Sequence, residues 1–95
     1  MIHQLYAPRY VVDSLFFSSG ISIIHMDYDY IDFEASESNA LNFGRRVCNV
    51  FDDEPEIELV INHDDGWQVE YCNRKGKLEK LAEHYMNSEE KEAYR

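Results

Sequence analysis

Residues 56–72 read EIELVINHDDGWQVEYC, and this stretch decides the fold. Every second residue is apolar at Ile57, Leu59 and Ile61 and again at Trp67, Val69 and Tyr71, with a polar segment between the two runs. A period of two is typical of a strand that buries one face. The segment therefore predicts a β-hairpin.

The length of the hairpin loop determines which residues pair. A two-residue turn would pair Ile61 with Glu70 and set apolar side chains against acidic ones along the whole ladder. A three-residue loop pairs Ile61 with Val69 instead, and it needs a positive φ at its third position, where Gly66 stands. A five-residue loop over 62–66 gives the same pairing and stays open as the alternative. We expect Gly66 to have a positive φ in either loop.

The segment before the hairpin carries the clearest helical pattern. Ser36 and Ser38 are both candidate N-caps, and Pro55 requires the helix to end before it. We expect this helix to run as far as Phe51. Its apolar stripe repeats at helical spacing and comprises Ala40, Gly44, Val47, Cys48 and Phe51.

The segment after the hairpin predicts a second helix. Beyond a turn over 73–76, apolar residues recur at helical spacing, which predicts a helix over 78–87. Ser88 is a candidate cap for a short last turn. The residues that set the pattern are Leu78, Leu81, Ala82 and Tyr85.

Two interpretations of the N-terminal segment stay open. Pro8 can begin a helix that runs to Phe17, but the β-branched and aromatic residues of 10–17 also fit a strand. We favour the helix. Residues 21–34 alternate as a strand does, with a change of phase near Tyr30 that indicates either a β-bulge or two adjoining strands.

Together these patterns predict one α+β domain over residues 1–95. We expect a three- to four-stranded antiparallel sheet with two or three helices packed on one face. A chain of 95 residues has room for a single core. Its apolar runs are too short to cross a bilayer and its first residues lack the pattern of a secretory leader, so we expect a cytoplasmic protein.

Charge is the strongest signal in the composition. The chain has 19 acidic residues against 9 lysines and arginines, for a net charge of −10. Fourteen of the acids lie between Asp13 and Glu70, where the only lysines or arginines are Arg45 and Arg46. A surface of this kind repels nucleic acid and anionic lipid, and it attracts basic proteins.

The acids of the predicted sheet can form an array. If a bulge corrects the change of phase, the four acids from Asp27 to Glu34 share one strand face at intervals of about 6.8 Å, roughly twice the axial rise of one DNA strand. A solvated outer sheet face is the alternative interpretation of the same acids. The predicted partner-binding residues are Asp27, Asp29, Asp32, Glu34, Asp52, Asp53, Glu54, Glu56, Glu58 and Glu70.

The sequence contains no recognisable motif for catalysis, metal binding or nucleotide binding. The two cysteines, Cys48 and Cys72, are far apart and the histidines are scattered, so no zinc site is indicated. The glycines do not form a phosphate-binding loop, and no serine or cysteine has the setting of a nucleophile. We expect no enzymatic activity, no cofactor and no metal, and we expect Cys48 to be buried and unpaired.

In size and charge the chain resembles phage-encoded anti-defence proteins, including anti-CRISPR and anti-restriction inhibitors, and immunity proteins that neutralise nuclease toxins. This resemblance concerns bulk properties and carries over no residues. It implies a phage or mobile-element inhibitor in the bacterial cytoplasm, which binds the nucleic-acid-binding surface of a nuclease or nuclease complex as a DNA or RNA mimic.

Other functions stay open on the same sequence. The alternatives are an immunity protein or antitoxin, a small acidic regulatory or structural subunit and, last, a small metal-dependent enzyme. The expected partner is a basic nucleic-acid-binding protein, and a homodimer also stays open. Direct binding to nucleic acid or to a membrane is not expected from the charge.

Overall fold

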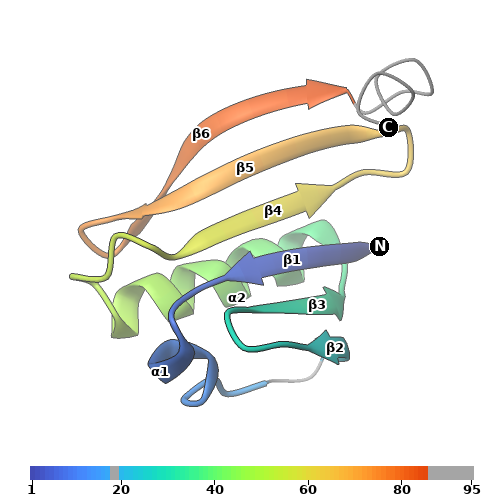
Figure 1. Ribbon diagram of the computed structural model, residues 1–95. Coiled ribbons are helices and arrows are strands. Elements are labelled where there is room, and N and C mark those ends of the chain that lie inside the picture. Colours follow the sequence, from blue (N-terminus) through green and yellow to red (C-terminus); the bar gives the residue numbers. More distant parts are fainter. Residues whose placement is uncertain (18–19, 86–95) are drawn as a thin grey trace.

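The computed structural model describes residues 1–17 and 20–85, which form six strands and two helices (Figure 1). In chain order the elements are β1 (Ile2–Tyr6), α1 (Arg9–Val12), β2 (Ser22–Met26), β3 (Tyr30–Glu34), α2 (Glu37–Val50), β4 (Glu58–Asn62), β5 (Trp67–Arg74) and β6 (Lys77–Tyr85).

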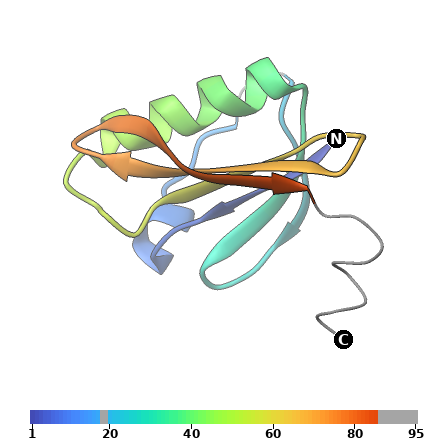
Figure 2. The same ribbon diagram turned by 90° about the horizontal axis from the view of Figure 1, so that it is seen from above.

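The strands form one antiparallel sheet in the order β2-β3-β1-β4-β5-β6, and α2 lies across one face of it (Figures 1 and 2). The expectation of three or four strands under two or three helices is therefore wrong. The described residues form a six-stranded sheet with one long helix. Two segments account for much of the difference, because the sequence pattern gives no strand at β1 and predicts a helix at β6.

The helix expected over 78–87 is wrong, because most of this segment belongs to strand β6. Two residues, Lys75 and Gly76, connect β5 to β6 with φ values of 52° and 88°. Positive φ at both central positions is what a tight hairpin turn requires. The chain therefore folds back along β5 as a strand. Ser88, the candidate cap of a last turn, lies outside the described residues.

A bulge in β6 explains why its sequence resembles a helix. Neighbouring residues of β5 pair with Ala82 and Lys80, so Leu81 is an extra residue without a partner opposite. This residue interrupts the alternation of the strand and places apolar residues at helical spacing. Pairing with β5 overrides the local pattern in this segment.

The hairpin over 56–72 has the predicted register. Ile61 pairs with Val69, and the N–H of His63 donates to the carbonyl oxygen of Trp67 over 2.8 Å. Gly66 has a φ of 90°. The three-residue loop is therefore confirmed.

The N-terminal segment differs from both interpretations of it. The helix is a single turn of four residues that follows Pro8, so neither a helix as far as Phe17 nor a strand over 10–17 forms. Val11 and Val12 are buried in the core. Burial of these two side chains, rather than helical propensity, accounts for the position of α1.

The alternating segment that follows forms two strands, β2 and β3. The N–H of Asp27 donates to the carbonyl oxygen of Tyr30 over 2.9 Å across the turn between them. The bulge lies at Ile24 in β2, because the pairing with β3 shifts between Ile23 and His25. The change of phase near Tyr30 therefore marks the start of a second strand.

Helix α2 begins at the first of its two candidate caps. The Ser36 Oγ accepts a hydrogen bond from the N–H of Asn39 over 3.2 Å. A Cβ atom added at Gly44 would lie 2.6 Å from Cδ2 of Leu59, so glycine allows α2 to approach β4 closely. Cys48 is buried and unpaired, as predicted. The buried residues of α2 are Ala40, Phe43, Gly44, Val47 and Cys48.

Candidate protein-binding surface

The face of the sheet opposite α2 has no long helix on it in the described part of the chain (Figure 2). Successive residues of a strand point to opposite faces, so the neighbours of the buried Leu5, Ile31 and Leu59 point away from α2. We call this surface the open face. On the four central strands its residues are Ile2, Gln4 and Tyr6 of β1, Tyr30, Asp32 and Glu34 of β3, Glu58, Val60 and Asn62 of β4, and Gln68, Glu70, Cys72 and Arg74 of β5.

Four of the predicted acids form two groups on the open face. Asp32 and Glu34 belong to β3, whereas Glu58 and Glu70 belong to the adjacent strands β4 and β5. Strand β1 lies between β3 and β4 and contributes no charged side chain to this face. With neighbouring strands about 4.8 Å apart, the two groups are separated by about 10 to 14 Å, close to the major-groove width of about 12 Å in DNA.

The β2–β3 turn places two more predicted acids beside the open face. Asp27 and Asp29 lie in this turn and not on the strand face expected for them. Burial, and then the carboxylates of the turn and of Asp32, raise the pKa of Tyr30. The ring of Tyr30 packs beside that of Tyr6, with 5.6 Å between the ring centroids. These acids therefore lie around a pair of aromatic side chains.

The carboxylate of Asp27 is stabilised in its ionised form. Its Oδ1 accepts the N–H of Tyr28 over 2.7 Å, and this hydrogen bond is the main reason that the pKa of Asp27 is lowered. Interactions with His25, whose Nε2 lies 3.6 Å from Oδ2, and with Arg9 lower the pKa further. The Arg9 guanidinium lies 5.1 Å from the centroid of the Tyr28 ring.

The acids of the α2–β4 loop form a separate group, which comprises Asp52, Asp53, Glu54 and Glu56. The Tyr10 hydroxyl donates to Oε1 of Glu54, and this bond, burial and the surrounding carboxylates raise the pKa of Tyr10 to about 12. A Cβ atom at Gly76 would lie 3.0 Å from Cβ of Asp52, so Asp52 lies beside the β5–β6 turn. This loop joins the helix layer to the sheet, and its acids are not part of the open face. Helix α1 contacts both sets of acids, through Tyr10 here and through Arg9 at the β2–β3 turn.

Sequence reasoning missed the uncharged residues that separate the two acidic groups. Gln4 and Tyr6 come from β1, for which the sequence pattern gives no strand. Residues 2–6 read IHQLY, in which apolar and polar types do not alternate, and five residues are too few to distinguish a strand from a loop.

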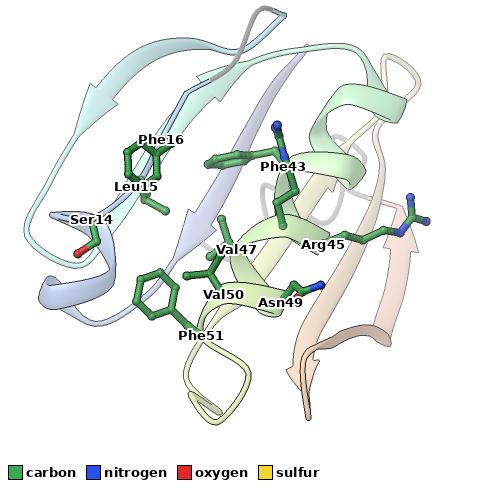
Figure 3. Close-up of a pocket in the computed structure, with 10 residues that line it drawn as sticks. Ser14, Leu15, Phe16, Phe43, Arg45, Val47, Asn49, Val50 and Phe51 are labelled. Atoms are coloured by element: carbon green, nitrogen blue, oxygen red, sulfur yellow. The ribbon is translucent and has the colours of Figure 1, made fainter.

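A second candidate site lies beside α2 and was not indicated by the sequence. It is a groove with a volume of about 380 Å³. Figure 3 shows the segment after α1 on one side of it and α2 on the other. We call it the apolar groove, and it is lined by Ser14, Leu15, Phe16, Phe43, Arg45, Arg46, Val47, Asn49, Val50 and Phe51.

Within residues 1–17 and 20–85, no group of three or more histidine, cysteine, aspartate or glutamate side chains is placed to hold a metal ion. No helix in these ranges is both long enough and apolar enough to cross a membrane. Each ion pair that involves a histidine in these ranges joins it to a single carboxylate. In one of them, His63 Nδ1 lies 3.8 Å from Glu37 Oε2.

Comparisons of the chain with protein-family models, with curated proteins and with solved structures found no match.

Proposed function

We propose that this protein is a non-enzymatic inhibitor whose open face occupies the nucleic-acid-binding surface of a nuclease or nuclease complex. The observation that supports this proposal most directly is the presence of two acidic groups on the open face, separated by uncharged residues of β1. A basic groove that binds two phosphate backbones has complementary charge on both of its sides. The inhibitor would accordingly compete with DNA or RNA.

The aromatic residues of the open face supply contact area that charge alone does not. The side chain of Tyr6 is 41% exposed beside that of Tyr30. Tyrosine is enriched at the centre of protein interfaces because its ring is large and rigid and its hydroxyl can form a hydrogen bond. In the proposed complex the carboxylates steer the encounter and the tyrosines lie at its centre.

The test measures cleavage of a DNA substrate by purified restriction nucleases, CRISPR nucleases and nuclease toxins, with and without the protein. We expect inhibition of at least one enzyme, and we expect an excess of uncleavable DNA to relieve it because both ligands compete for one surface. The enzyme that is inhibited distinguishes an anti-defence protein from an immunity protein.

Two double variants with the same change in charge locate the interface. Asp32→Lys with Glu34→Lys removes the acidic group of β3, whereas Asp52→Lys with Asp64→Lys changes two exposed acids outside the open face. Each pair makes two changes of +2 and so takes the net charge from −10 to −6. We expect the first pair to weaken inhibition by roughly tenfold or more and the second by less than about twofold. Equal loss from both pairs would mean that net charge alone matters, and full inhibition by both would reject the open face as the interface.

A further inference from the structure

The surface beside α2 exposes large apolar side chains at the rim of the apolar groove. Phe16 is 89% exposed and Val50 is 70% exposed. Figure 3 shows both of them among the side chains that line the groove, together with Phe43 and Val47, which are buried. Clustered exposed apolar residues of this kind mark interaction surfaces.

We propose that this surface is the interface of a symmetric homodimer, in which a second copy of the chain occupies the apolar groove. A two-fold interface uses the same patch on both copies, so the patch must complement itself. This patch provides both parts that are needed, since Phe16 and Val50 project from it and the groove of about 380 Å³ receives such side chains. The proposal concerns the side of the sheet opposite the open face and does not depend on the proposed function.

The charged residues near the C-terminal end of α2 can also pair with those of a second copy. Arg46 and Val50 are spaced at i and i+4 on α2, and Asp53 follows Val50 by three residues in the turn after the helix. If two copies cross in antiparallel orientation at Val50, Arg46 of each copy lies beside Asp53 of the other. Arg46 also has an interaction within its own chain. A guanidinium has five N–H donors and can serve both.

The proposed contact accounts for an unfavourable feature at the end of α2. Its last turn has no basic residue, and Asp52, Asp53 and Glu54 follow close behind. Acids near a helix C-terminus oppose the helix dipole. Arg46 of the second copy would offset this repulsion, which gives the acids of the loop a role separate from the open face.

The first test measures the mass of the full chain by sedimentation equilibrium. We expect twice the chain mass of 11.3 kDa for the unaltered protein and a single chain mass for Val50→Asp. Leu81→Asp is the matched control, because Leu81 is also apolar and 59% exposed but lies on edge strand β6. It should stay dimeric. Circular dichroism checks that each variant is folded.

The second test exchanges the charges. Arg46→Glu alone and Asp53→Arg alone should each be monomeric, because each brings like charges together at both contacts across the two-fold axis. An equimolar mixture of the two variants should form a heterodimer. In that heterodimer each contact joins position 46 of one copy to position 53 of the other, and both contacts again pair an acid with an arginine.

Several outcomes would overturn the proposal. They are a monomeric unaltered protein at millimolar concentration, a Val50→Asp variant that stays dimeric, and a mixture of the charge variants that stays monomeric. Binding of an acidic apolar peptide or a fatty acid to a monomeric protein would assign the groove to another ligand. A nuclease assay on folded Val50→Asp separates the two proposals, because inhibition through the open face should survive the loss of the dimer.

Discussion

The imidazole Nδ1 of His3, in β1, accepts a hydrogen bond from the backbone N–H of Asn62, in β4, over 3.0 Å. The other ring nitrogen, Nε2, donates to the carbonyl oxygen of Ala35 over 3.0 Å. A neutral imidazole offers one donor and one acceptor, so these two bonds satisfy it. The side chain is fully buried, and burial lowers the pKa of His3. Protonation of Nδ1 would set its N–H against the N–H of Asn62 and remove this hydrogen bond between β1 and β4.

The stability of the protein should therefore fall below pH 6.5. The pKa of His3 in the folded state is lower than the usual value of 6.5, so the unfolded chain binds the proton more readily. The contribution of His3 is complete above pH 6.5 and is lost as the pH falls through the folded pKa. Urea denaturation between pH 7 and pH 5.5 should show the free energy of unfolding decrease, with a slope from this group of at most about 1.4 kcal/mol per pH unit.

His3→Gln is the control for this prediction. The glutamine amide can donate and accept hydrogen bonds but does not titrate. The variant should be less stable than the unaltered protein at pH 7 and should show a smaller slope over the same range. An identical slope would assign the pH dependence to another group.

Gly66→Ala should destabilise the protein by about 1 kcal/mol. The φ of Gly66 is 90°, in a region that an alanine enters only with strain. Asp64→Ala, in the same loop, should change the free energy of unfolding by less than about 0.5 kcal/mol because the position is exposed. Chemical denaturation of both variants measures the difference. Equal effects would show that the positive φ carries no cost.

The two cysteines should react with thiol reagents at different rates. Burial raises the pKa of Cys48 to about 11, so little thiolate is present at pH 8. Cys72 is partly exposed on the open face and should react first. Mass spectrometry of iodoacetamide-treated protein over time should show one modification in the native state and a second only on unfolding. Early modification of Cys48 would contradict its buried position.

Association with a nuclease target should slow as salt is added. The carboxylates of the open face act at long range, and the Debye length falls from about 10 Å at 0.1 M to about 3 Å at 1 M salt. We expect the association rate constant to decrease by an order of magnitude or more while the dissociation rate constant changes little. Surface plasmon resonance at several salt concentrations separates the two constants. A salt effect confined to dissociation would argue against steering by the acids.

The sequence predicts those parts of the fold that local interactions determine. Ser36 caps α2, and Gly66 fixes the register of the β4–β5 hairpin, and both signals lie within a few residues of the structure they specify. Strand β1 depends instead on distant partners, since Gln4 pairs with Val60. Strand β6 depends on its pairing with β5 and on the bulge at Leu81, which no local pattern reveals.

The same distinction applies to the candidate site. Composition and spacing identify acids such as Asp32 and Glu58 as candidates. They do not predict that these two lie on opposite sides of β1, because that requires the order of the strands. The apolar groove has no sequence signal, since it forms where the segment after α1 meets the side of α2.

Strand β1 cannot reach its final place until both of its neighbours exist. Strands β2–β3 and β4–β5–β6 are joined by short turns and can pair as soon as they are synthesised. β1 comes first along the chain, yet its pairing with β4 closes the loop from Gln4 to Val60, and long loops are slow to close. We therefore expect folding to join two preformed sheet fragments through β1. Strand β1 would leave the ribosome before the other five strands of this sheet and dock after them, and until it does the inner edges of β3 and β4 remain open to pairing with other chains.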